Sequence, residues 1–277
     1  MREPTTPAGG KSYPVLRLRD GRGVKKDDMT NAPISRLLCS VVTAIALGLG
    51  VVIVAAAPAQ AGPDLTQPFT RELVKRGDVD RDPYNIEHVY EVQIRLQRLG
   101  HLKARPNGTF GPKTEAAVMR FQRSMGLRPT GRVNAQTWKP LIRRSTLGRK
   151  VVPAACKKAG WHACYDRKRH QVSLYRNGQL HNSWLVRGGA YNSQTRTGNF
   201  TVYWRSENHR SRTYGGAPMP YSQFFSGGQA LHGSRLMMNP YEGHSHGCVN
   251  FWVEDARQLW RLTHDKKLYV HVYGAWD

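Results

Sequence analysis

The spacing of apolar residues changes near residue 150 and divides the chain into two kinds of structure. Between residues 83 and 142, apolar positions recur every three or four residues, which is the period of a helix with one buried face. From about residue 151, apolar and polar residues alternate instead, which is the period of a strand with one buried face. The pattern therefore predicts a helical domain followed by a mostly β domain.

Three short helices are predicted in the helical part, each with one apolar stripe. Gly100 ends the first helix, and Pro112 can occupy the first turn of the second, where its missing N–H leaves no helical hydrogen bond unmade. Asn134 can cap the third helix. The stripes are Val89, Val92, Leu96 and Leu99, then Ala117, Val118, Phe121 and Met125, and then Trp138 and Leu141. These helices form a small bundle without a catalytic set of side chains.

The β part carries one strong hairpin signal. Asn177-Gly178 follows an alternating segment, and Asn-Gly in this position is typical of a two-residue turn between paired strands. The alternating segments are 171–176, 183–186, 200–204 and 268–273, and one convincing helix places Ala256, Leu259 and Trp260 on one face. The predicted fold class is therefore multidomain. A three-helix N-terminal bundle precedes a mostly β domain, sandwich-like or barrel-like, with one or two helices.

An export signal precedes both domains. Residues 37–58 are almost wholly apolar and uncharged, Arg36 precedes them, and Ala59-Gln60-Ala61 follows, which is the layout of a signal peptide with its cleavage site. The run is also long enough to be an uncleaved membrane anchor. In both cases we expect an extracytoplasmic protein, secreted or anchored, that contacts the membrane only through this N-terminal segment.

The same patterns suggest domain boundaries. Residues 1–61 are assigned to a cytoplasmic extension and the signal peptide or anchor, with Met29 as an alternative start because the residues before it are polar and unpatterned. Residues 62–82 are rich in proline and charge without any period, and they are predicted to be a linker. The helical domain is then 83–144 and the β domain 150–277.

The chain is strongly basic, with 42 Lys and Arg against 19 Asp and Glu and a formal net charge of +23. Residues 1–61 contribute +4 of this charge, which leaves +19 on the remainder. Such a charge attracts polyanions. The export signal argues against nucleic acid as the partner and favours an anionic wall or membrane surface. A merely solubilising surface is the alternative.

Three cysteines lie outside the export segment, and two of them are predicted to form a disulfide. Exported proteins usually pair their cysteines, and Cys156 and Cys164 enclose a short segment that contains Gly160. Cys248 is then left single. An unpaired cysteine in an exported protein indicates either an intermolecular link or a reactive thiol.

The helical segment resembles the peptidoglycan-binding-like domain family. The matching residues are Leu96-Gln97 with Leu99-Gly100, Asn107-Gly108-Thr109-Phe110-Gly111, Phe121-Gln122, Gly126-Leu127, Thr130-Gly131 and Thr137-Trp138. Asn107 stands where the family commonly has Asp. The resemblance implies binding to cell-wall glycan or stem peptide, and a helical spacer that keeps only the fold is the alternative.

The β segment resembles the L,D-transpeptidase catalytic family over about residues 160–273. The family motif is a His, a spacer, and then Ser/Thr-His-Gly-Cys, one apolar residue and Asn. Here the motif reads His232 followed by Ser245-His246-Gly247-Cys248-Val249-Asn250. Two upstream segments also match, namely Thr195-Arg196-Thr197-Gly198-Asn199-Phe200, in which Arg196 replaces Pro, and Ser226-Gly227-Gly228-Gln229-Ala230-Leu231-His232-Gly233.

The resemblance implies a cysteine acyltransferase of peptidoglycan that needs no cofactor and no metal. Cys248 is the nucleophile on a tetrapeptide stem, His232 is the base, and the backbone carbonyl of Gly233 orients His232. His246, Gly247 and Cys248 line the oxyanion site, while Ser245 and Asn250 hold the loop or contact substrate. Carbapenem inhibitors are expected to acylate the cysteine. From the residues themselves, we expect the helix that begins near Val253 and a nearby imidazole to lower the pKa of Cys248.

Other functions use the same residues. Transfer of the acyl group to an amine would form cell-wall cross-links, and transfer to water would trim stems as an L,D-carboxypeptidase does. His232, His244, His246 and Cys248 also have the chemistry of zinc ligands, so a zinc-dependent wall peptidase is a further alternative. His244 and His246 compete with His232 for the role of base because they lie nearer to Cys248 in sequence. A wall-binding protein with an inactive enzyme domain is the last alternative.

Overall fold

The structure is a computed structural model that describes residues 64–147 and 152–276. The predicted signal peptide or anchor, its cleavage site and the alternative start at Met29 lie outside the described residues. Among the residues that are described, no helix is long and apolar enough to cross a membrane.

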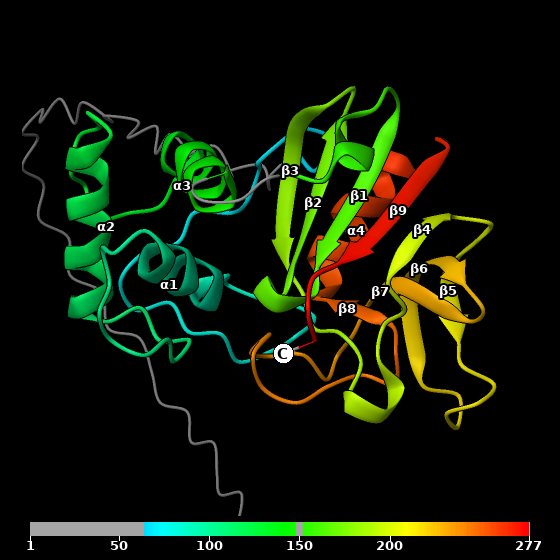
Figure 1. The fold of residues 1–277 in the computed structure, drawn as a ribbon. Helices are drawn as coiled ribbons and strands as arrows, with labels where there is room; N and C mark the ends of the chain where they lie inside the picture. The colour runs from blue at the N-terminus through cyan, green and yellow to red at the C-terminus, as the bar shows by residue number, and fades with distance from the viewer. Residues whose placement is uncertain (1–63, 148–151, 277) are drawn as a thin grey trace, which may run out of the picture. The chain divides into compact units, whose positions relative to one another are not determined.

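The three predicted helices are present (Figure 1). They are α1 (Val89–Arg98), α2 (Pro112–Ser124) and α3 (Ala135–Leu147). Their apolar stripes meet in one core, in which Val92, Phe121 and Trp138 are almost completely buried. Pro112 lies in the first turn of α2, as predicted.

A buried glutamine on each of the first two helices holds the glycine turn that follows the helix. Gln93 accepts hydrogen bonds from the backbone N–H groups of Asn107 (2.8 Å) and Gly108 (3.0 Å). Gln122 accepts one from Gly131 N–H (3.0 Å). Both glycines have positive φ, which is why these turns require glycine.

The segment before α1 has a defined place in the structure, although its sequence suggested a linker. Val74 forms a β-bridge with Val133 and is fully buried, and Phe69 is buried in the same core. Two widely spaced apolar residues therefore hold a segment that is otherwise polar and has no period.

The second part of the chain has nine strands within residues 152–276, arranged in two sheets. The five-stranded sheet has the order β3-β2-β1-β9-β4, and the four-stranded sheet has the order β5-β6-β7-β8. The strands are β1 (Trp161–Asp166), β2 (Gln171–Arg176), β3 (Gln179–Leu185), β4 (Gly198–Thr201), β5 (Trp204–Arg210), β6 (Pro218–Ser226), β7 (Gln229–Gly233), β8 (Val249–Phe251) and β9 (Leu268–Tyr273). Short 3₁₀ helices occupy Ala154–Lys157, Arg167–Arg169 and Tyr191–Ser193. A three-helix bundle followed by a mostly β domain confirms the predicted fold class.

One α-helix, α4 (Val253–Thr263), packs against β6 and β7. Ala256 and Leu259 on its buried face join the core that also contains Trp184 and Phe251. Asn177-Gly178 forms the turn between β2 and β3, as predicted from the alternating pattern. The predicted alternating segments 171–176, 183–186 and 268–273 correspond to β2, β3 and β9, whereas the predicted strand 200–204 is divided between the end of β4 at Thr201 and the start of β5 at Trp204.

A buried ion network joins the helical part to the β part. Glu91 on α1 lies 3.0 Å from Arg71 Nε and 2.7 Å from Arg95 Nη2, and all three side chains are almost completely buried. Arg71 also pairs with Asp255 on α4 (3.3 Å), and Arg95 donates to the Ser183 carbonyl on β3 (2.9 Å). Charged groups from three separate segments therefore meet in one buried junction.

Cys156 and Cys164 form the predicted disulfide, with their Cα atoms 6.2 Å apart. Both residues are buried, and the bond ties the 3₁₀ turn Ala154–Lys157 to β1. Replacing both cysteines by alanine is expected to lower the free energy of unfolding by about 2.6 kcal/mol, because the unfolded chain loses a closed loop. Urea unfolding measures this loss, with wild-type protein in reductant as the matched control. A loss below about 1 kcal/mol in both samples would contradict the prediction.

Candidate active site

The two predicted reactive residues lie on neighbouring parallel strands. His232 is on β7 and Cys248 immediately precedes β8, and these strands pair with Leu231 opposite Val249. Extending this register by one residue brings Cys248 opposite Ala230, on the face of the sheet that also carries His232. Cys248 packs against Ala230 in the same apolar cluster. The sheet thus brings the thiol and imidazole to one face.

The loop that carries the thiol is held by the segment after β3. The backbone N–H of Ser245 donates to the Gly188 carbonyl (2.9 Å), and Ala190 N–H donates to the Ser245 carbonyl (3.0 Å). A Cβ atom on Gly189 would lie 2.8 Å from the Cα of Gly247, so only glycine allows this approach. Neither Gly188 nor Gly189 belongs to the motifs that predicted the site. A Gly-Gly pair after a strand was the available signal.

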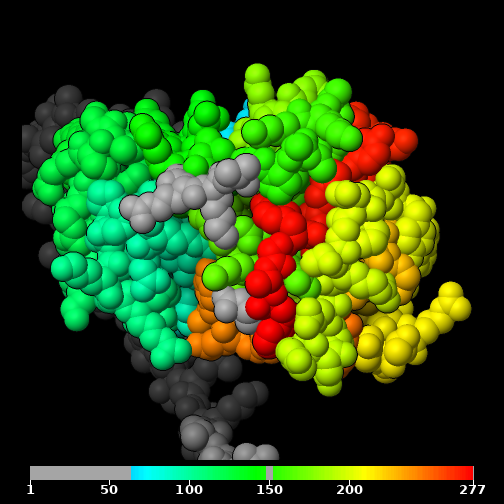
Figure 2. Space-filling model, viewed as in Figure 1, coloured from blue at the N-terminus to red at the C-terminus, as the bar shows by residue number. Residues whose placement is uncertain are grey.

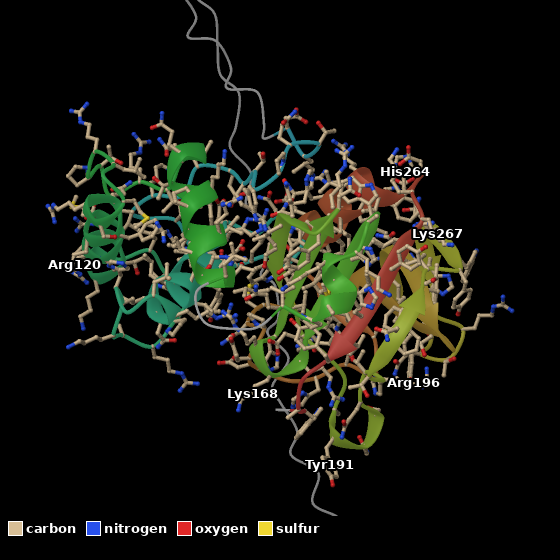
Figure 3. The ribbon with its side chains drawn as sticks, turned by 45° about the horizontal axis from the view of Figure 1, so that its top comes forward. Arg120, Lys168, Tyr191, Arg196, His264 and Lys267 are labelled. Atoms are coloured by element: carbon tan, nitrogen blue, oxygen red, sulfur yellow. A yellow bond between two sulfur atoms is a disulfide. The ribbon has the colours of Figure 1, made fainter. Side chains whose placement is uncertain are left out.

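The C-terminal tail supports the same segment. The Trp276 indole donates to the Gly189 carbonyl (2.8 Å), and its ring packs against Tyr191 and His244. Figure 2 shows the C-terminal strand and tail (red) at the surface beside the segment around residue 190 (yellow-green), and Figure 3 labels Tyr191 at the tip of that segment.

Position 247 requires glycine because of its backbone angle and because of the side chain packed against it. Its φ is +116°, and a Cβ at this position would lie 2.4 Å from the side-chain nitrogen of Gln229. Gln229 is itself fixed, since it donates to the Gln194 carbonyl (2.9 Å) and accepts from Arg196 N–H (3.0 Å). Gln229 was part of the matching segment but had no predicted role. In the structure, the Gln229 side chain lies against Gly247 and supports the loop that carries the thiol.

Ser245 closes the loop with two hydrogen bonds. Its hydroxyl donates to the Cys248 carbonyl (2.6 Å) and accepts from Gly247 N–H (3.1 Å). In this conformation, the Gly247 amide therefore points to Ser245. The oxyanion role implied for Gly247 and His246 stays a prediction.

His232 has one defined tautomer. Nδ1 donates to the Gly233 carbonyl at 2.7 Å, and a carbonyl can only accept, so the proton of the neutral ring is on Nδ1. Burial lowers the pKa of His232 to about 4, against the opposite effect of the Gly233 carbonyl. At neutral pH the ring is therefore uncharged and its Nε2 carries a lone pair that can accept a proton.

The two competing histidines have different surroundings. His244 and His246 are both exposed, and their rings contact Trp276 (5.5 Å between centroids) and Tyr214 (4.4 Å). In the described structure, neither ring has a backbone partner that fixes its tautomer in the way Gly233 fixes that of His232.

Cys248 is a free, half-buried thiol. Its Sγ lies 3.9 Å from the Gly228 carbonyl oxygen, to which the thiol donates a long hydrogen bond. Burial raises the pKa of Cys248, and the backbone of Ala230 opposes this only partly. The expectation of a lowered pKa was therefore wrong for the free protein.

Asn250 offers an unused polar atom beside this pair. It lies opposite His232 in the β7–β8 register, and its backbone exchanges hydrogen bonds with Arg187. Its side-chain oxygen is buried and has no hydrogen-bond partner among the described residues.

The four residues considered as zinc ligands do not converge in the described structure. The sets of ligand atoms that lie within 4.8 Å of one another there are Glu72, His88 and Glu254, and His88, Glu91 and Asp255. His232, His244, His246 and Cys248 form no such set within the same residues.

Two family models match the chain. A model described as a peptidoglycan binding domain matches residues 85–141, and one described as an L,D-transpeptidase catalytic domain matches residues 160–271. An uncharacterized protein of Kitasatospora aureofaciens is 35% identical over 120 residues, which cover 42% of this chain and 96% of that protein.

Solved structures with related folds include L,D-transpeptidases. One from Xylanimonas cellulosilytica is 25% identical, covers 73% of this chain and 98% of its own, and has a TM-score of 0.43. L,D-transpeptidase 3 of Mycobacterium tuberculosis, solved with a faropenem-derived adduct, is 16% identical, covers 41% of this chain and 60% of its own, and has a TM-score of 0.37.

Proposed function

Since this chain has a peptidoglycan binding domain followed by an L,D-transpeptidase catalytic domain, we propose that it cross-links peptidoglycan through a thioester on Cys248. The acyl group comes from a tetrapeptide stem and passes to an amine. The observation that carries this proposal is a free thiol on the same sheet face as an imidazole whose proton is held on Nδ1 by Gly233.

Acylation starts from two neutral groups. His232 Nε2 takes the thiol proton as Sγ attacks the carbonyl carbon at the L-centre of the stem, and the imidazolium then gives that proton to the departing D-Ala amine. Because burial holds the pKa of the thiol up and that of the imidazole down, proton transfer must accompany substrate binding rather than precede it. The backbone carbonyl of Gly233 stabilises the imidazolium in place of a carboxylate.

The acceptor decides the product. An amine from a second stem gives a cross-link, and water gives a trimmed stem, so L,D-carboxypeptidase activity is the second candidate function.

The proposed place of action is the bacterial cell wall, outside the cytoplasm. The net charge of +23 favours an anionic wall, and the helical domain would hold the enzyme near glycan or stem peptide. Tetrapeptide stems are the proposed substrate, and no cofactor is needed for the steps above.

Incubation of the protein with purified tetrapeptide muropeptides, followed by mass analysis, tests the proposal. Dimers lacking one D-Ala are expected, whereas tripeptides alone would indicate trimming. The matched control is Cys248→Ser, which should give neither product. A carbapenem should add its whole mass to the wild-type protein and nothing to the variant, because opening of the strained amide ring forms the thioester without a leaving group.

A chelator separates the thiol enzyme from a zinc peptidase. EDTA should leave the activity unchanged, and iodoacetamide should abolish it. Loss of activity in EDTA with recovery on adding Zn²⁺ would favour the peptidase.

A further inference from the structure

Transfer to an amine presents a proton problem that transfer to water does not. An aliphatic amine with a pKa of about 10 is almost wholly protonated at pH 7, so it must lose one proton to become a nucleophile and a second after it attacks. Water is already neutral and loses only one. If the proposed function holds, one imidazole suffices for hydrolysis, and a second proton acceptor near the thioester would speed cross-linking by deprotonating the ammonium group there.

A second imidazole lies on the thiol face of the four-stranded sheet. His209 on β5 packs edge-on against Phe224 (5.0 Å between ring centroids) and Trp204 (5.2 Å). Phe224, Met219 and Ala230 form the apolar cluster against which Cys248 packs. The thiol and the His209 ring therefore both lie against this cluster, His209 through Phe224.

His209 reaches this face because the hairpin of β5 and β6 is irregular. Residues five apart in a regular strand point to opposite faces, yet Trp204 and His209 contact the same ring, and Met219 and Phe224 share one cluster. Tyr221, between Met219 and Phe224, has a left-handed backbone with φ of +59°. A left-handed backbone is costly for an aromatic residue in a strand. Here it shifts the alternation of side chains along the hairpin, so that His209 lies on the same face as Trp204.

The His209 ring is free to act on a ligand. It is half-buried, and neither ring nitrogen has a hydrogen-bond partner in the part of the chain that the structure describes. The pKa of His232 is lowered mainly by burial and, to a smaller extent, by the charge of His209, so the two rings interact electrostatically. Burial and then the charge of Arg212 lower the pKa of His209, so the ring is neutral at neutral pH and able to accept a proton.

We propose that His209 is a second base of the active site, which takes the first proton from the ammonium group of the acyl acceptor. The resulting amine attacks the thioester carbon, the C–N bond forms, and the C–S bond breaks. The second amine proton passes to His232 and from there to the leaving sulfur. Acyl-enzyme and ammonium thus give the amide, the Cys248 thiol and one proton, which His209 releases to solvent.

The variant His209→Gln tests whether His209 serves the acceptor amine without serving acylation or hydrolysis. With tetrapeptide muropeptide as both donor and acceptor at pH 7, dimer formation should fall about 100-fold, while tripeptide formation changes by less than about threefold. His264→Gln is the matched control. His264 is an exposed histidine at the end of α4 (Figure 3), and its ring also packs on an aromatic ring, that of Trp260. It should leave both products unchanged.

Two readouts exclude a merely structural effect. The dimer defect of His209→Gln should shrink as the pH rises toward the acceptor pKa, since the amine then arrives unprotonated. Hydroxylamine, which is unprotonated at pH 7, should capture the acyl group equally well in the variant and the wild type.

The outcomes distinguish this proposal from the proposed function. The role of His209 would be overturned if His209→Gln lost dimer and tripeptide equally, or if its dimer defect did not depend on pH. It would also be overturned if His246→Gln, and not His209→Gln, lost dimer selectively. Wild-type protein that forms only tripeptide would overturn it as well, because there would be no amine acceptor to serve. Failure of Cys248 to form any acyl-enzyme would remove the proposed function itself.

Discussion

His232→Gln is expected to slow acylation of Cys248 by about 10³-fold at pH 7, because no other group would take the thiol proton as the sulfur attacks. In the wild-type protein the pKa of His232 is about 4, so the base is unprotonated from about pH 5 upward and the rate should be nearly flat from there to about pH 8. In the variant only the free thiolate reacts. Burial raises the pKa of Cys248, so the thiolate fraction, and with it the rate, should rise about tenfold per pH unit over the same range.

The measurement is the rate of carbapenem adduct formation by mass spectrometry across pH 5 to 9. The difference between variant and wild type should shrink toward high pH, where thiolate forms without a base. His244→Gln and His246→Gln are matched controls, since both are exposed histidines of the same loop, and both should keep the flat profile. A flat profile in His232→Gln and a sloping one in either control would assign the base to the other histidine.

Glu91→Ala is expected to destabilise the protein by about 3–5 kcal/mol, which is a large part of the stability of a typical domain. Burial alone would raise the pKa of Glu91, but Arg71 and Arg95 outweigh it and lower the pKa to about 2. Without the carboxylate, the buried Arg71 guanidinium keeps Asp255 as an ion-pair partner, and the buried Arg95 guanidinium keeps none among the described residues. The cost is that of burying uncompensated charge, not of losing one favourable contact.

Urea unfolding of Glu91→Ala tests this, with Glu242→Ala as the control. Glu242 also pairs with an arginine, Arg105, but both side chains are largely exposed and 3.7 Å apart. Its removal should cost less than about 1 kcal/mol. A similar small cost for Glu91→Ala would show that the junction is held mainly by apolar contacts.

The junction also relates to function. Arg71, Glu91 and Asp255 come from the segment before α1, from α1 and from α4, and α4 packs on the strand that carries His232. The ion network therefore links the helical domain to the helix that packs on the catalytic sheet. Disruption at Glu91 should therefore reduce activity on intact wall more than acylation by a small carbapenem.

Local patterns in the sequence were sufficient for much of this structure. A period of three to four residues placed α1, α2 and α3, and alternation with Asn177-Gly178 placed β2 and β3, because both signals depend only on neighbours along the chain. The pairing of Cys156 with Cys164 followed from their proximity in sequence. The choice of Cys248 and His232 as reactive residues came from a motif, and their roles stay predictions that the experiments above address.

Long-range packing decided the burial, the charge state and the contacts of the site residues, which these local patterns did not contain. The direction of the Cys248 pKa shift depends on how deeply the sheet buries the sulfur, and the packing of Gly189 on Gly247 joins residues 58 positions apart. The ion network of Arg71, Glu91 and Asp255 and the placement of His209 on the thiol face depend on contacts between distant segments and on a single left-handed residue, Tyr221. Sequence alone therefore determined the α-helices, the strands β2, β3, β4 and β9, and the residue types that carry the chemistry. Only the tertiary structure determined their burial, charge state and neighbours, since desolvation and close approach arise between segments that are far apart in the chain.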